Sequence, residues 1–203
     1  EDPTQLERAD VPDIVMVNDP TNLDAFKAVN RNSFYQWHAY RPDVHKPGRV
    51  GESMRSDFCF VGTGYKSRIN FLEAVDWSGI DATLAGHWQY LQDDSPLMPF
   101  LAHEKEHCCD NSDSVKLYRG TKISANLYRQ EAEDGADHRG WAMGPREVEL
   151  AATGTFYLTE PRGENREVFP MVPTFTEPSE FGDLVDRKST RLNSSHGYIS
   201  YAV

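Results

Sequence analysis

The feature that most constrains the fold is a strand, glycine turn, helix and strand in succession from Phe58 onward. Phe58–Val61 is a continuous apolar run, typical of a parallel strand covered on both faces, and glycines at 62 and 64 follow it. Residues 69–75 carry apolar side chains at helical spacing, and Ile80–Ala85 is a second strand-like run closed by glycine. The pattern predicts a βαβ unit, whose two strands are parallel.

The same alternation continues to the region of residue 158. After an irregular stretch at 87–112, the pattern predicts a helix at 114–122, a strand at 123–128, a helix at 145–153 and a strand at 155–158. Helices that alternate with short apolar strands are typical of an α/β domain. The sequence therefore predicts a Rossmann-like, doubly wound parallel sheet over residues 57–185.

The chain before this domain has a different organisation. The apolar run at 12–17 predicts a buried strand, and the residues after it have helical spacing. Residues 40–56 are rich in proline and glycine, which is typical of a connection between domains. We therefore divide the chain into residues 1–39, which belong to a first domain, a linker at 40–56 and a second domain at 57–185.

The last residues, 186–203, differ in composition from the rest. They are basic and polar without amphipathic period, which is typical of a disordered tail, and they resemble the conceptual translation of a sequencing adapter. We expect a non-native tail from Asp186, and a natural protein that is truncated at both ends.

Charge and composition exclude several classes of function. The 203 residues carry a net charge of -11, which disfavours nonspecific binding to nucleic acid. Apolar runs are too short for a membrane span, and the three cysteines, Cys59, Cys108 and Cys109, favour free thiols in a reducing compartment. We expect a cytoplasmic protein, in which a local cradle of N–H groups and basic side chains can still bind a small anion.

Ligands of open α/β sheets bind at the carboxyl ends of the strands, so the loops at 62–68, 126–144 and 159–170 are the candidate site. In the first loop, Gly62 and Gly64 allow close approach of a ligand, and Lys66 or Arg68 can add positive charge. A plain tight turn remains an alternative interpretation of these glycines.

The helix predicted at 145–153 has the clearest signals. Pro145 suits the first helical position and Gly154 the position just past the end. Arg146 and Glu149 are three residues apart and so share one face, where they form either part of a site or a surface ion pair.

The segment from Arg146 to Gly154 reads R-x-x-E-x-x-A-x-G before an apolar strand, and it resembles the signature of group 1 glycosyltransferases of the GT-B fold. The spore-maturation-protein-like branch, from bacteria or phage, is the most similar. Residues 18–20 with 40–47 resemble the interdomain crossing, residues 60–68 the first donor loop, and 123–127 the strand before the donor loop.

The resemblance implies a hexosyltransferase that needs neither metal nor cofactor and moves a sugar from a nucleotide diphosphate to an unknown acceptor, which is a glycan, protein, lipid or modified nucleic acid. Residues 1–39 would form the last part of the acceptor-side domain, and the fragment itself would be inactive. Glu149 would bind the ribose, while Arg146 and the N–H groups of 144–146 would face the diphosphate. The implied nucleotide-sugar-binding residues are Gly62, Thr63, Gly64, Arg68, Asn126, Met143, Gly144, Arg146 and Glu149. The catalytic residues are unknown, and Trp141 stands where many relatives carry a second acidic residue.

Three alternatives remain open. His103 to His107 reads HExxH, which on a helix would place two imidazoles on one face for a protease zinc, with Glu131 or Glu133 as third ligand. Cys108 and Cys109 could instead complete a structural metal site. A dehydrogenase-like dinucleotide site is disfavoured, because the second strand ends without an acidic residue. A non-catalytic nucleotide- or sugar-binding module is the third alternative.

Overall fold

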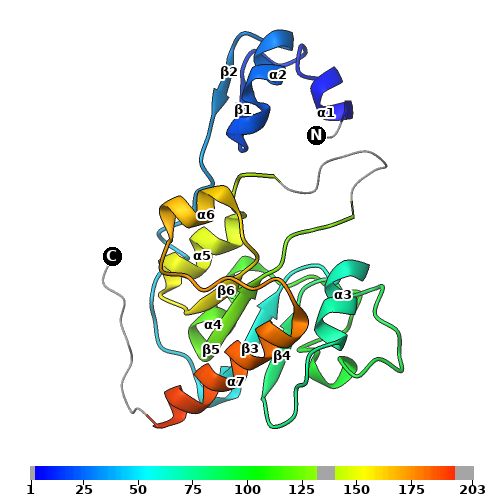
Figure 1. Cartoon of the computed structure of the whole chain (residues 1–203), viewed down its shortest axis with the longest axis vertical. Helices are drawn as coiled ribbons and strands as arrows, with labels where there is room; N and C mark the ends of the chain where they lie inside the picture. The colour runs from blue at the N-terminus through cyan, green and yellow to red at the C-terminus, as the bar shows by residue number, and fades with distance from the viewer. Residues whose placement is uncertain (1–2, 132–139, 195–203) are drawn as a thin grey trace.

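The structure is a computed structural model that describes residues 3–131 and 140–194. It consists of a small N-terminal lobe, residues 3–35, and a larger C-terminal lobe, residues 56–194, joined by the mostly extended segment 36–55 (Figure 1). None of the helices in the described residues is long and apolar enough to cross a membrane.

The N-terminal lobe is a two-stranded parallel sheet with helices beside it. Its elements are α1 (Pro3–Glu7), β1 (Val15–Val17), the 3-10 turn η1 (Pro20–Asn22), α2 (Leu23–Val29) and β2 (Ser33–Tyr35). The predicted strand and helix are both present, with the strand confined to the end of the 12–17 run. The predicted burial of this strand is wrong, because Met16 is exposed and only Val17 of its three residues is buried. Strand β2, which is only three residues long, was not predicted.

The C-terminal lobe is built on a four-stranded sheet in the order β4-β3-β5-β6, with all neighbours parallel. The strands are β3 (Ser56–Val61), β4 (Ala82–Ala85), β5 (Thr121–Asn126) and β6 (Tyr157–Thr159). The helices are α3 (Lys66–Glu73), α4 (Asn111–Gly120), α5 (Pro145–Thr153), α6 (Gly163–Val168) and α7 (Pro178–Ser194), with short 3-10 turns η2 (Glu52–Met54) and η3 (Met98–Phe100). The predicted parallel α/β sheet is therefore confirmed.

Both faces of this sheet are covered, as the alternation within β3 shows. Phe58 and Phe60 pack in the larger hydrophobic cluster, which contains buried residues of α3 and α7. Cys59 and Val61 point the opposite way into a second cluster with Tyr118 of α4 and Leu150 of α5. A strand that is buried on both sides needs apolar residues at every position, which explains the unbroken run Phe58–Val61.

Helix α7 corrects the predicted disorder at the carboxyl end. It continues from Pro178 through Asp186 to Ser194 and lies along the lower part of the sheet (Figure 1). Phe181 and Val185 are fully buried, so the helix is anchored before Asp186, and no proline or glycine follows until Gly197. The foreign origin of residues 186–203 stays a prediction, and residues 195–203 lie outside the described part of the chain.

The linker is held against the C-terminal lobe. Arg119 of α4 donates from Nε to the carbonyl of Lys46 at 2.8 Å and from Nη2 to the carbonyl of Val44 at 3.0 Å. Segment 36–55 thus runs beside α4. It contains all of the predicted linker 40–56 except Ser56, which is the first residue of β3.

Candidate functional site

The carboxyl ends of β3, β5 and β6 meet at one edge of the sheet because the strands are parallel. Asn126, the last residue of β5, pairs in register with Thr159 of β6, and Gly62 directly follows β3. Helix α5 begins at the same edge, because its residue Arg146 contacts Asn126. Three strand ends and one helix N-terminus therefore surround a common space.

Helix α5 has the ends that its sequence predicts. Pro145 occupies the first turn, and Gly154 after the helix has φ 73°, a left-handed conformation that glycine adopts without strain. Leu150 is fully buried and fixes the inner face of the helix against the sheet. This face directs the side chain of Arg146 toward the strand ends.

Arg146 lies between the ends of β3 and β5. Its Nη1 donates to Oδ1 of Asn126 at 3.1 Å, and its guanidinium lies 4.8 Å from the ring centroid of Phe60. A Cβ at position 62 would be 2.4 Å from Nη2 of Arg146. The backbone of Gly62 therefore lies directly beside this guanidinium, and a side chain at position 62 would displace it.

Arg68 has a supporting position at the same edge. It is buried, and it donates from Nη1 to the carbonyl of Thr63 at 3.0 Å and from Nη2 to the carbonyl of Leu127 at 2.6 Å. Burial lowers the pKa of Arg68 to about 10, and the nearby charge of Arg146 acts in the same direction. The two bonds tie the loop after β3 to the end of β5.

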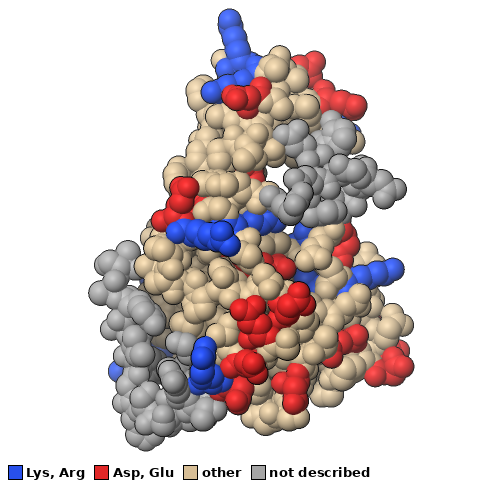
Figure 2. Space-filling model, viewed as in Figure 1, with Lys and Arg blue, Asp and Glu red and all other residues tan. Residues whose placement is uncertain are grey.

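Further guanidinium groups stack on aromatic rings at this edge. Arg129 lies over Tyr65 at 4.8 Å, and Arg162 lies over Tyr128 at 4.1 Å. Although the chain has a net charge of -11, positive charge gathers where the strands end. Figure 2 shows basic atoms across the middle of one face and acidic atoms mainly below them. Planar guanidinium groups match the geometry of phosphate and carboxylate oxygens.

Glu147 is the residue that sequence reasoning missed. It is fully buried, and it accepts hydrogen bonds from donors of several elements. These donors are Gly144 N, Tyr128 OH, Asn126 Nδ2, Thr159 Oγ1 and Asn165 Nδ2. Burial raises the pKa of Glu147, and the hydrogen bonds offset this only in part. A glutamate at the third helical position after glycine and proline is a known capping signal that could have identified it.

Other predicted site residues serve the fold in ways that the sequence did not reveal. Gly64 leaves space for the ring of Trp88, since a Cβ there would be 2.4 Å from it. The N–H of the buried Met143 donates to Oε2 of Glu164 at 2.7 Å.

The predicted row of open N–H groups at 144–146 needs correction. The N–H of Gly144 donates to Oε2 of Glu147 at 2.8 Å, and Pro145 has no N–H. Of the three positions, only Arg146 keeps an N–H that can face a ligand. Negative charge at this edge must therefore be balanced mainly by side chains.

The side chain of Glu149 lies beside the linker. Its side chain is 25 % exposed, and its Oε1 lies 3.9 Å from Nε2 of the buried His45. Nδ1 of His45 accepts the N–H of Arg41 at 3.1 Å, so Nε2 carries the ring proton and faces the carboxylate. No local pattern predicts this contact, because the two residues are 104 positions apart.

A cleft of about 930 Å³ lies between the lobes beside this edge. Trp141, the residue that departs from the family pattern, lines it and rests on the backbone of Gly163, where a Cβ would overlap the indole at 2.1 Å. Burial raises the pKa of Glu160, another lining residue. The lining consists of Thr21, Tyr128, Gln130, Gly140, Trp141, Glu160, Pro161, Arg162, Gly163 and Arg166.

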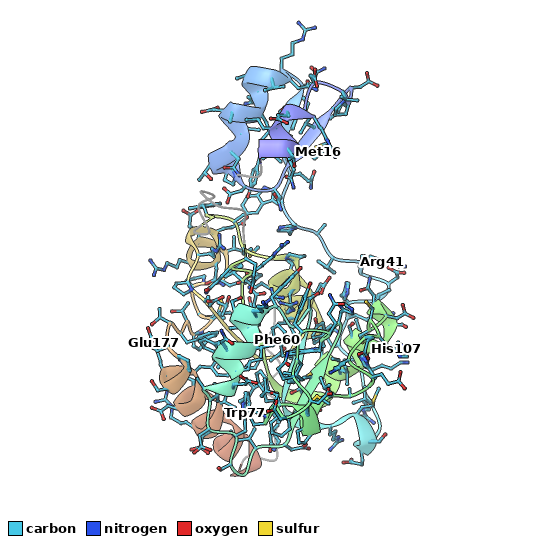
Figure 3. All side chains as sticks on the ribbon, turned by 90° about the vertical axis from the view of Figure 1, so that its right-hand side faces the viewer. Met16, Arg41, Phe60, Trp77, His107 and Glu177 are labelled. Carbon is cyan, nitrogen blue, oxygen red and sulfur yellow. The ribbon has the colours of Figure 1, made fainter. Side chains whose placement is uncertain are left out.

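The zinc-protease alternative is contradicted by the local structure. Residues 103–107 form bends and turns, so His103 and His107 do not share a helical face. Nε2 of His103 instead accepts the N–H of Gly86 at 3.2 Å, and His107 lies at the edge of the lobe, away from Phe60 (Figure 3). Glu131 binds the N–H of Ser67 at 2.6 Å.

The other proposed metal ligands give no support either. Glu133 lies outside the described residues. Over residues 3–131 and 140–187, no group of three or more His, Cys, Asp or Glu side chains is arranged to hold a metal.

The fold and this edge define a class. The chain is an α/β protein with a parallel sheet like the Rossmann-like domains of GT-B glycosyltransferases. A family model described as glycosyl transferase-like matches residues 67–194, more than half of the chain, and the chain belongs to this family.

One solved structure extends the likeness of fold to both lobes. The sucrose-phosphate synthase of Thermosynechococcus elongatus superposes with a TM-score of 0.56 at 14 % identity, over 96 % of this chain and 53 % of that one. The chain thus spans about half the length of that protein. No curated protein sequence matches the chain.

Proposed function

We propose that this chain binds a nucleotide-diphosphate sugar at the carboxyl edge of its larger sheet, as part of an enzyme that transfers the sugar, a hexose, to an acceptor. The single observation that carries the proposal is the placement of Arg146 between Gly62 and Asn126. It puts a guanidinium at the meeting point of two strand ends and a helix N-terminus, where a diphosphate is stabilised.

The diphosphate is the leaving group of such a transfer, and its negative charge grows as the bond to the sugar breaks. Arg146 uses Nη1 for Asn126 and retains further N–H donors for phosphate oxygens. Arg68 adds positive charge behind it, with both terminal nitrogens bound to carbonyls. A preorganised positive site of this kind lowers the barrier by stabilising the developing charge, which in our proposal requires no metal ion.

Glu149 is the proposed partner of the ribose. Its carboxylate is partly exposed, and its Oε1 lies 3.9 Å from Nε2 of His45. The two hydroxyl groups of a ribose can donate to such a carboxylate, and each charge-assisted bond contributes roughly 1.5–3 kcal/mol. His45 would orient the carboxylate from the linker side.

The cleft between the lobes is the proposed place of the transferred sugar. It adjoins the strand edge through Tyr128, whose hydroxyl donates to Glu147. Glu160 and Gln130 offer polar atoms to sugar hydroxyls, and Trp141 offers an aromatic surface.

The test is a thermal-shift series on the full chain with UDP, GDP, ADP and their sugars. At a ligand concentration about 100-fold above Kd, binding stabilises a protein by about 2.7 kcal/mol, which corresponds to roughly 5–10 °C at this size. We expect at least one nucleotide to do so, and Arg146→Gln and Glu149→Gln to reduce the shift.

Matched controls are Arg55→Gln and Glu52→Gln, because these two residues are exposed and form an ion pair with each other at 3.1 Å. They should leave the shift unchanged. If no nucleotide stabilises the chain, or if Arg146→Gln and Glu149→Gln respond as the wild type does, the proposed function is wrong.

A further inference from the structure

Four consecutive backbone N–H groups, those of residues 141–144, all donate to carboxylates. Trp141 and Ala142 donate to Oδ2 of Asp19, at 2.8 and 3.0 Å. The next two N–H groups, at 143 and 144, donate to Glu164 at 2.7 Å and to Glu147 at 2.8 Å. The segment that leads into α5 is therefore held by three acidic side chains.

Asp19 differs from the other two carboxylates because it belongs to the N-terminal lobe. It lies in the turn after β1 and is only 8 % exposed. Its Oδ1 accepts the N–H of Thr21 at 3.0 Å and the hydroxyl of Thr21 at 2.6 Å, which fixes the side chain within its own lobe. Its Oδ2 is thereby directed at the C-terminal lobe.

Tyr35 of β2 supplies a second link between the lobes. Its hydroxyl donates to Oε1 of Glu164 at 2.7 Å, while Oε2 of the same carboxylate binds the N–H of Met143. Both links end on the segment 141–143. The N-terminal lobe thus contacts the lead-in of α5 directly through Asp19 and indirectly through Tyr35.

These contacts bear on the proposed donor site because Arg146 lies only two residues beyond Gly144. A run of adjacent N–H groups would by itself attract an anion, but here the protein's own carboxylates occupy it. The segment cannot then serve as the phosphate cradle. It serves instead to fix the first turn of α5 and with it the guanidinium of Arg146.

We propose that Asp19 is a positioning residue of the donor site: by holding the N–H groups of Trp141 and Ala142, it sets the start of α5 and the orientation of Arg146. The N-terminal lobe thereby contributes to nucleotide affinity through a residue that touches no nucleotide. This inference rests on the proposed function for its effect on affinity, but its structural part can be measured without any ligand.

The experiment compares Asp19→Ala and Asp19→Asn with the wild-type chain by amide hydrogen exchange and by nucleotide titration well below the melting temperature. Loss of two hydrogen bonds to a charged group should speed exchange in 141–144 and in the first turn of α5, and weaken nucleotide binding about tenfold. Asp19→Asn keeps one acceptor oxygen and should show a smaller effect on both. Asp13→Ala, an exposed aspartate of the same lobe, is the control.

Each outcome is decisive. Slower or unchanged exchange at 146–149 in Asp19→Ala overturns the inference, even if the variant melts at a lower temperature, because Asp19 would then only join the lobes. Faster exchange with unchanged nucleotide affinity overturns it as well. If the wild type binds no nucleotide, the proposed function fails, and the exchange at 146–149 still shows whether Asp19 sets the start of α5.

Discussion

At the scale of single residues, the site is organised by a buried carboxylate that no ligand needs to touch. Glu147 accepts hydrogen bonds from residues of β5, β6, α6 and the start of its own helix. Asn126, one of these donors, itself accepts a hydrogen bond from Arg146. A charge buried in this way is tolerated only because its oxygens are fully bonded. The orientation of Asn126, and through it of Arg146, depends on this network.

We expect Glu147→Gln to destabilise the chain by about 3 kcal/mol. The amide retains one oxygen and replaces the other with a donor, so donors such as Tyr128 OH and the N–H of Gly144 lose their acceptor. Chemical denaturation with a linear extrapolation measures the change. Glu52→Gln, at an exposed position, should change the stability by less than about 0.5 kcal/mol. Equal stability of the two variants would contradict the network.

At the scale of elements, some helices are predicted by their own residues and others are not. Helix α5 has proline at its start, glycine past its end and an apolar inner face, and its bounds agree with the prediction. Helix α6 was missed because its signals lie in tertiary contacts, whereas α7 carries Phe181, Leu184 and Val185 at helical spacing, a local signal that was overlooked. The pattern around α6 is dominated by the polar residues Glu164 and Asn165, which are buried only because Glu147, Tyr35 and Met143 bind them.

Gly154→Ala should test how far the end of α5 depends on glycine. An alanine at φ 73° is strained, so we expect a loss of about 1 kcal/mol in the free energy of unfolding. Gly51→Ala is the matched control, because Gly51 has φ -67° and open space around it, and it should be neutral or slightly stabilising. A neutral Gly154→Ala would show that the helix end can rearrange without cost.

At the scale of the whole molecule, the two lobes are joined by a linker and by hydrogen bonds to carboxylate side chains. The extended segment 36–55 lies against α4, and Asp19 and Tyr35 bind the C-terminal lobe directly. Figure 1 shows the smaller lobe above the edge at which β5 and β6 end. The position of the cleft follows from these contacts, because Thr21 of one lobe and Trp141 of the other both line it.

The pH dependence of stability should reveal the contact of Asp19. Burial alone would raise the pKa of Asp19, but hydrogen bonds from Thr21, Ala142 and Trp141 outweigh burial and lower it. A lowered pKa means that the contribution to stability is present above the ordinary aspartate value of about 4 and is lost as the pH falls below it. Denaturation of wild type and Asp19→Asn between pH 6 and pH 3, in steps of about half a unit, should show a smaller loss in the variant. Identical slopes would contradict this assignment.

The family match adds one point at this scale. It extends to residue 194, past Asp186, where the composition of the sequence predicts a foreign tail. Helix α7 also continues to residue 194. The helix continues past Asp186 because it is anchored by the buried Phe181 and Val185, and a helix once formed extends along following residues that lack proline and glycine.

The sequence by itself determined the class of fold and the ends of α5. Continuous apolar strands, glycine turns and helical spacing are local patterns, and they were enough to predict parallel strands with helices on both faces. They also brought Gly62, Asn126 and Arg146 to one edge, because parallel strands end together.

Only the tertiary structure decided which partner each polar group has. Four of the five donors around Glu147 lie far from it in the chain, and so do the partners in the contact of Glu149 with His45 and in the hydrogen bonds of Asp19 to residues 141–142. The physical reason is that a buried carboxylate or N–H group must be satisfied by whatever the fold brings near it, and no local pattern records that choice.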